Sequence, residues 1–278
     1  MADAFLLYEN IFRDGAAAAS SEDLADGFPA AFACDDRPFV THWSPAGLTP
    51  SEWLQADAGA GNAYAPDALC MIDHNLSSAC ASGASATVLW SDDGSSWTAA
   101  ASTVPSSDGT LFLALPGQSA HRFWRVRFDA LGPGGFGSFL RVGQITLGRR
   151  FVFPEGLQPG FDPRAETVKT TASTSQGGVF LGSDLLYVDR KFALNWPAAP
   201  GIAEAFFSGG GMNFNDFWDN HAGRGPKGRG PLPFWFAWDS DQEPPSWCRV
   251  SGGQVSAPWG PTYQRRGLQL KLDVLTEV

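Results

Sequence analysis

The chain has 278 residues, of which 44% are hydrophobic and 17% charged; this composition excludes an intrinsically disordered chain and predicts a sizeable folded core. Its 19 basic and 29 acidic residues give a formal net charge of -10, which argues against general nucleic-acid binding because like charges repel a phosphate backbone. No window approaches the roughly 20 apolar residues of a membrane span, and the start lacks a basic secretion signal, so we expect no membrane span and assembly in a cytoplasm.

The first half of the chain consists of short apolar runs between clusters of Gly, Pro, Ser and Asp, which is the pattern of β-strands. Strands are predicted at residues 5–11, 68–74, 86–91, 110–115, 123–130 and 139–148. In the fifth of these, Arg125 and Arg127 alternate with Trp124, Val126 and Phe128, so one face of that strand can be buried. Several short strands at this spacing are typical of a β-sandwich.

A composition shift near residues 148–156 predicts a domain boundary. Residues 1–150 hold 16 acids and 8 bases, a net charge of -8, whereas residues 151–278 hold 13 acids and 11 bases, a net charge of -2. We therefore expect two domains, 1–150 and 151–278. The four cysteines, Cys34, Cys70, Cys80 and Cys248, are expected to be buried reduced thiols.

The second half also favours strands. One or two are predicted within residues 176–197, and one each at 233–240, 246–252 and 268–278. Helices are expected only at 201–208 and 213–221, where Phe214, Phe217 and Trp218 follow helical spacing, and residues 222–231 predict a loop. The fold class is therefore all-β, with a short helical insertion in the second domain.

The stretch SDDGSSW, residues 91–97, raises the question of a metal site. A helix–loop–helix calcium loop needs spaced acidic ligands and a later glutamate, whereas here the aspartates are adjacent and the flanks are strands. Asp-Gly between two apolar runs instead predicts a hairpin turn, in which Gly94 adopts a positive φ.

Other candidate chemistry is weak at the sequence level. Cys70, His74 and Cys80 match no common zinc spacing, and no nucleophile motif accompanies the histidines. Asp239, Asp241 and Glu243 could form a glycosidase pair, but their position before two prolines favours a hairpin connection. We expect no enzyme, no cofactor and no metal.

Three segments together carry a resemblance: HNLSSACASGASATVLWSDDGSSW, HRFWRVRF and LRVGQITLG. They resemble the discoidin-type, galactose-binding-like β-sandwich, in which a strand ends in an Asp-Gly hairpin. The resemblance covers about residues 5–150 and implies a jelly-roll sandwich there, followed by a β-rich domain. No sugar site is carried over, because no binding loop can be matched residue by residue.

The whole chain also resembles tail proteins of long-tailed phages, through AFLLYENIFRDG, DDRPFVTHWSP and PFWFAWDSDQEPPSWCRVS. This resemblance implies a structural component of a tail tip or baseplate, similar to distal-tail proteins and located in the virion. It implies a homo-oligomeric ring, hexameric in preference to trimeric, formed mainly by residues 160–278, with tail-tube, hub and baseplate proteins as partners. The domain order departs from the commonest distal-tail layout, in which the ring-forming part comes first.

Two other functions remain open. The first domain could be a carbohydrate-binding module that attaches a virion to host surface glycans, and Arg37, His42 and Trp43 are then the candidate contacts to a glycan or partner. A glycan-degrading enzyme that uses Asp239 or Asp241 is the third alternative.

Overall fold

The computed structural model describes residues 4–132, 134–153, 161–162, 166–176, 178–196, 214–222, 232–239, 241, 243–256 and 268–275. It divides into two compact units, one of Leu7–Arg150 and one of Met1–Leu6 with Phe151–Val278. The division after residue 150 coincides with the boundary expected from composition. The first residues join the second unit because β1 (Phe5–Leu7) lies in its sheet, between β10 (Arg150–Val152) and β13 (Phe234–Ala237).

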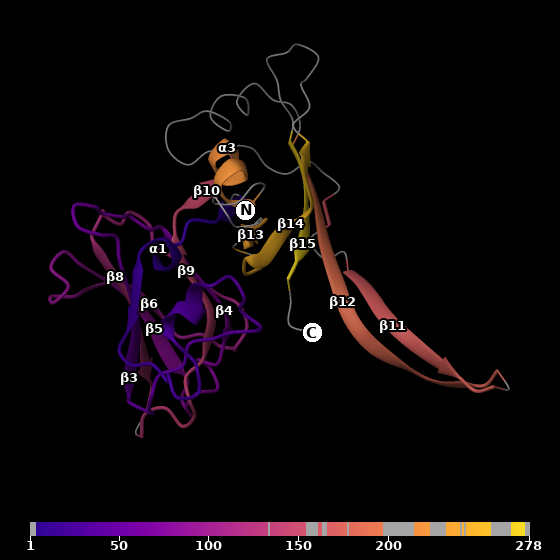
Figure 1. Ribbon diagram of the computed structural model, residues 1–278, viewed down its shortest axis with the longest axis horizontal. Coiled ribbons are helices and arrows are strands. Elements are labelled where there is room, and N and C mark those ends of the chain that lie inside the picture. Colours follow the sequence, from indigo (N-terminus) through magenta and orange to yellow (C-terminus); the bar gives the residue numbers. More distant parts are fainter. Residues whose placement is uncertain are drawn as a thin grey trace, which may run out of the picture. The chain divides into compact units, whose positions relative to one another are not determined.

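The unit Leu7–Arg150 is a two-sheet antiparallel sandwich (Figure 1). Its larger sheet has five strands in the order β2 (Ala16–Ala19), β3 (Ser51–Asp57), β8 (Phe123–Ala130), β5 (Ala84–Ser91) and β6 (Thr98–Thr103). Its smaller sheet has three, in the order β7 (Leu111–Ala114), β4 (Ala68–His74) and β9 (Val142–Gly148).

Alternation along the strands builds the core between these two sheets. Trp124, Val126 and Phe128 of β8 are fully buried, and they belong to one apolar cluster with Leu69 of β4 and Ile145 of β9. The residues between them on β8 point to the outer face of the five-stranded sheet, as the sequence predicted. Arg125 and Arg127 of β8 therefore lie on the outer face of this sheet.

The first predicted strand is too long, and Asn10 is the reason. The strand ends at Leu7, and α1 (Ile11–Asp14) begins where the Asn10 side chain caps it by accepting the N–H of Phe12 at 3.2 Å. The Asn10 amide also donates to the carbonyl of Ile145 at 2.8 Å and ties this turn to β9. A second short helical segment, η1 (Ala30–Cys34), precedes β3.

The second unit contains a seven-stranded sheet in the order β10-β1-β13-β14-β15-β12-β11. Here β14 spans Ser246–Ser256, β15 Leu268–Val274, β12 Phe180–Trp196 and β11 Glu166–Thr174. Aromatic pairs hold it together: Phe192 packs on Phe236 with ring centroids 5.5 Å apart, and Trp235 on Trp247 at 4.9 Å.

A short helical insertion packs on this sheet, as expected. It consists of α3 (Phe214–Phe217) and the π-helical turn η2 (Trp218–Ala222). Phe217 is buried and meets the Phe234 ring of β13 edge-on, with centroids 4.8 Å apart. The helix predicted at 201–208, and all but the first residue of the loop at 222–231, lie outside the described residues.

The β11–β12 hairpin is the most extended feature of this unit (Figure 1). β12 is a single strand of 17 residues; its end, Lys191–Trp196, pairs with β15, and its beginning pairs with β11. Every residue of β11 is exposed. We call the two strands and their connection, residues 166–190, the arm.

The fold class predicted from the sequence is confirmed: the protein is all-β, with a sandwich followed by a β-rich unit that carries a short helical insertion. Within the described ranges, no helix has the length and apolar character needed to cross a membrane.

Gly148→Ala should destabilise the sandwich, because a Cβ at this position would overlap the Glu9 carbonyl oxygen and lie 2.9 Å from Leu7 Cδ1. Such overpacking costs about 1–3 kcal/mol of unfolding free energy. Chemical denaturation measures it. Gly47→Ala is the matched control, since a Cβ there meets nothing within 4 Å; equal effects of the two substitutions would contradict the packing described here.

Candidate functional site

The segment between η1 and β3 carries the three residues predicted to contact a glycan or partner. Arg37 is exposed and pairs with Asp35, with Nη2 2.6 Å from Oδ2. His42 is half-buried and stacks on Phe28 with ring centroids 4.3 Å apart. Burial, and then the positive charge of Arg141, lower the pKa of His42, which keeps the ring neutral at pH 7. Contact of Arg37 and His42 with a ligand stays a prediction.

Trp43 occupies a different environment from these two. It is fully buried, its indole Nε1 donates to the Ser21 carbonyl at 3.0 Å, and its backbone pairs with Val142 in both directions. An aromatic ring must expose a face to stack on a sugar, so the expectation that Trp43 contacts a ligand is corrected: its side chain belongs to the core.

The SDDGSS stretch forms the β5–β6 hairpin, as predicted. The Asp93 carboxylate accepts the backbone N–H groups of Ser95 and Ser96, each at 2.8 Å, and the Ser91 hydroxyl at 2.9 Å. These donors hold the pKa of Asp93 well below its usual range. Gly94 has a φ of 73° and supplies the reversal. The Asp93 carboxylate therefore stabilises the turn.

The neighbouring Asp92 connects the hairpin to the loop before β8. Its Oδ1 lies 3.0 Å from His121 Nδ1. The His121 ring stacks on Trp90 with centroids 3.6 Å apart and meets the edge of Trp124 at 5.9 Å. This cluster is a structural clamp between the two loops.

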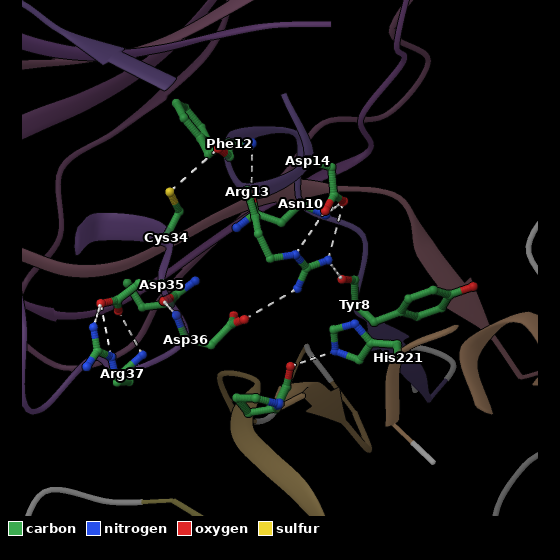
Figure 2. Close-up of polar contacts among 12 residues, drawn as sticks. Tyr8, Asn10, Phe12, Arg13, Asp14, Cys34, Asp35, Asp36, Arg37 and His221 are labelled. Carbon is green, nitrogen blue, oxygen red and sulfur yellow. Dashed lines mark hydrogen bonds and ion pairs between the residues drawn. The ribbon is translucent and has the colours of Figure 1, made fainter. Parts of the chain in front are cut away.

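A pocket of about 270 Å³ opens beside these loops, between α1 and the loop after β3. We call it the Tyr64 pocket. Its lining residues come from two short segments: Glu9, Asn10, Ile11, Asp14, Gly15, Ala58, Asn62, Ala63 and Tyr64. Figure 2 shows how Arg13 anchors α1 near it, by donating to Asp14 and to the Tyr8 carbonyl and by pairing with Asp36 at 3.7 Å.

One wall of the Tyr64 pocket is held rigid by a charged cluster. The Glu9 carboxylate accepts the Tyr64 hydroxyl at 2.7 Å and two N–H groups of Arg149, both at 2.7 Å. Burial, followed by the charge of Glu9, raises the pKa of the Tyr64 hydroxyl, which stays protonated. The tyrosine ring is therefore fixed in place as one wall.

None of the residues that line the Tyr64 pocket is Ser, Thr, Cys or His, and its ionisable groups are the carboxylates of Glu9 and Asp14 and the hydroxyl of Tyr64. The Glu9 carboxylate is occupied by Tyr64 and Arg149, and that of Asp14 accepts from Arg13. The exposed groups are the amide of Asn62 and the carboxylate of Asp14, beside the small apolar Ala58 and Ala63. A half-buried aromatic ring with a few polar groups suits a small polar ligand with some apolar surface.

The carboxylates of the second unit form a turn. Asp239 is buried, its Oδ1 accepts the backbone N–H of Asp241 at 3.1 Å, and its carbonyl accepts that of Glu243 at 3.2 Å. Glu243 pairs with Arg190 at 3.1 Å. This geometry agrees with the hairpin interpretation over the glycosidase alternative.

All four cysteines are free thiols, as expected; Cys34, Cys70 and Cys248 are buried and Cys80 is partly so. Burial raises the pKa of Cys34 to about 12, which keeps it an unreactive thiol. Within the part of the chain that the structure describes, no group of three or more His, Cys, Asp and Glu side chains is arranged to hold a metal ion.

Sequence reasoning missed the Tyr64 pocket. Glu9 was placed inside a strand, and its partners Tyr64 and Arg149 lie 55 and 140 positions away in the chain. No local pattern marks such a cluster. Only the pairing of the turn at Asn10 with β9, seen in three dimensions, brings these residues together.

No protein-family model and no curated protein matches this chain. Several solved structures do. The chain is similar to a chitosan-binding module from a chitosanase/glucanase of Paenibacillus sp. IK-5, at 19% identity and a TM-score of 0.40, over 50% of this chain and 98% of that one. It is similar to a Clostridium perfringens module, CpGH89CBM32-5, in complex with GalNAc-β-1,3-galactose, at 15% identity and a TM-score of 0.39, over 50% and 99%.

A third neighbour is a Ruminococcus gnavus fucosidase in complex with fucose, at 12% identity and a TM-score of 0.40, over 51% of this chain and 27% of that one. The neighbours thus include carbohydrate-binding modules and a glycoside hydrolase. The function of this chain has to be argued from its own residues.

His74 should make stability depend on pH. It is buried, and burial lowers its pKa from 6.5 to about 4. Between these values the unfolded chain binds a proton that the folded chain does not, so stability is complete above pH 6.5 and falls as the pH drops to about 4, by on the order of 3 kcal/mol. Denaturation of His74→Gln across this range should show a shallower slope; an unchanged slope would contradict the assignment.

Proposed function

We propose that this chain is a non-catalytic carbohydrate-recognition protein whose sandwich binds a saccharide in the Tyr64 pocket. The observation that carries the proposal is the pocket itself: about 270 Å³, with a fixed tyrosine ring on one wall and the polar groups of Asn62 and Asp14 exposed. Of the functions expected from the sequence, this was the alternative, and carbohydrate is also the ligand class named for the structural neighbours.

The chemistry of the pocket fits a saccharide in two respects. A sugar ring presents C–H groups on one face and hydroxyls around its edge, so it uses an aromatic wall and hydrogen-bonding groups together. Asn62 supplies a donor and an acceptor, and Asp14 supplies acceptors. The Glu9 and Arg149 charges neutralise one another beside Tyr64, with Arg149 Cζ 5.3 Å from the tyrosine ring centroid, so this part of the wall carries no net charge.

Filling the Tyr64 pocket should weaken saccharide binding. In Ala63→Trp the new indole occupies the space between Asn62 and Tyr64, and saccharide affinity in calorimetry should fall at least about tenfold, the effect of removing about 1.4 kcal/mol of contacts. The saccharide is chosen by screening the intact chain on a glycan array. Ala60→Trp is the matched control, because Ala60 lies in the same loop, is also exposed and does not line the pocket.

Three outcomes contradict this function. They are that the intact chain binds no saccharide on the array, that Ala63→Trp binds as tightly as the unaltered chain, and that Ala60→Trp loses as much affinity as Ala63→Trp. Circular dichroism of both variants confirms that the sandwich is folded.

An oligomeric structural role is a second candidate, and the arm favours it. Six large apolar side chains of the arm are exposed: Val168, Val179, Phe180, Leu181, Leu186 and Val188. Val168 and Val188 lie opposite each other on the two strands. A two-stranded ribbon is marginal in water, and contiguous exposed apolar side chains mark an interaction surface.

We propose a second copy of this chain as the occupant of the arm. The arm carries three acids, Glu166, Asp184 and Asp189, and two bases, Lys169 and Arg190, and Lys191 follows directly after it. An apolar ribbon of such low net charge can approach a chain of net charge -10 with little repulsion. The finer expectations, a hexameric ring in a phage tail tip that joins tube, hub and baseplate proteins, rest on the resemblance in sequence and remain proposals.

Polar substitution of the arm should dissociate the assembly. Phe180→Ser should shift the mass measured by analytical ultracentrifugation toward the monomer. It removes from the interface an aromatic side chain that is 62% exposed in the single chain. Leu24→Ser is the control, since Leu24 is as exposed, at 65%, but lies in the sandwich. A chain that is monomeric at high concentration before any substitution would contradict the structural role.

A further inference from the structure

The outer face of the five-stranded sheet carries a stack of three side chains. The guanidinium of Arg125 on β8 lies between two indoles, with Cζ 4.0 Å from the ring centroid of Trp53 on β3 and 3.8 Å from that of Trp97, which follows the β5–β6 hairpin. All three residues are half-buried and reach the surface. We call them the Arg125 stack.

Arg125 differs from every other described arginine. Ten arginines lie in the described ranges, and nine of them form an ion pair with a carboxylate; Arg125 alone does not. The nine are Arg13, Arg37, Arg122, Arg127, Arg141, Arg149, Arg150, Arg190 and Arg249. In a chain with ten more acids than bases, a carboxylate is the commonest partner available. Among the described arginines, Arg125 therefore keeps a positive charge that no carboxylate neutralises.

The contacts of Arg125 leave hydrogen-bond donors at the outer end of its guanidinium. One Nη2 N–H donates to Gln55 Oε1 at 2.7 Å and Nε is buried without a partner, so the remaining N–H groups of Nη1 and Nη2 are the donors that an external carboxylate can reach. Its neighbour on the same face, Arg127, pairs with Asp129 at 2.8 Å. Burial, and then the like charge of Arg127, lower the pKa of Arg125, so the charged form is destabilised where it stands. A bound anion offsets both the cost of burying the guanidinium charge and its repulsion by Arg127.

We propose that the Arg125 stack is a second ligand site, which binds the carboxylate of an acidic saccharide. This inference rests on the proposed function of the sandwich as a carbohydrate-recognition unit, and it names the class of saccharide. A planar guanidinium held by two indoles presents its free N–H groups in one plane, which is the arrangement that binds a carboxylate through two parallel hydrogen bonds.

Polar groups lie near the stack on the same face. Gln55 lies opposite Arg125 on β3, and Thr87, which is buried and bonds Ser102 at 2.9 Å, lies opposite Arg127 on β5. Amide and hydroxyl groups beside an arginine and two aromatic rings match the carboxylate, hydroxyls and C–H faces of a uronic acid. A carboxylate on a sugar is therefore the occupant to which we commit.

The test compares one saccharide with and without its charge. The intact chain is titrated with an oligogalacturonate and with its methyl ester, which differ only at the carboxylate. The unaltered protein should bind the acid about tenfold more tightly, and Arg125→Gln should remove this preference while it binds the ester as before. Arg125→Lys should lose most of the preference as well, because an ammonium cannot form the paired contact.

Indole N–H signals of Trp53 and Trp97 in an NMR titration locate the site, and they should shift with the acid more than with the ester. Arg37→Gln is the matched control, since Arg37 is exposed but already pairs with Asp35. The inference is overturned if the acid has no advantage, if Arg37→Gln reduces it equally, or if Arg125→Gln weakens acid and ester alike.

The same titration separates this inference from the proposed function. Ala63→Trp should weaken binding at the Tyr64 pocket but leave the shifts of the Trp53 and Trp97 indole signals, and the preference for the acid that they report, unchanged, because the pocket and the Arg125 stack share no residue. If Ala63→Trp has no effect while Arg125→Gln removes the preference for the acid, the proposal for the Tyr64 pocket is wrong and the proposal for the Arg125 stack is supported.

Discussion

The alternation of side chains along β8 is the constraint on which the sandwich depends. Trp124, Val126 and Phe128 enter the core, and Arg125 and Arg127 face outward, while both edges of the strand pair in register with β3 and β5. A slip of one residue would bury two guanidinium groups and expose two aromatic rings, so the register is strongly specified. The strand that closes the core therefore also creates the outer face where the Arg125 stack lies.

Most polar side chains of the sandwich hold its loops in place, and this separates structural groups from available ones. Asp93 fixes the β5–β6 turn, and Asn10 caps α1 while it bonds to β9. Glu9 is enclosed by Tyr64 and Arg149. Polar groups that these contacts leave include the amide oxygen of Asn62 at the mouth of the Tyr64 pocket and the outer end of the Arg125 guanidinium.

Local pattern located several strands in which apolar residues are flanked by turn residues, but it missed β3, although burial alternates along it from Ser51 to Asp57. The strands at 68–74 and 123–130 have the predicted bounds, and the Asp-Gly hairpin follows from two residues. The Ala-rich edge strands β2 and β6 were missed, because alanine has no β preference and their pairing is decided by neighbours far away in sequence. For the same reason neither the burial of Trp43 nor the pocket at Tyr64 could be predicted: both depend on contacts across the fold.

The central claim is that the sandwich recognises a saccharide through the Tyr64 pocket. The most direct measurement is a crystal structure of the intact chain with the tightest-binding saccharide from a glycan array. The account predicts a sugar ring against Tyr64 with a hydroxyl bonded to Asn62. A sugar seated instead beside Arg37 and His42, with the Tyr64 pocket holding only water, would contradict it.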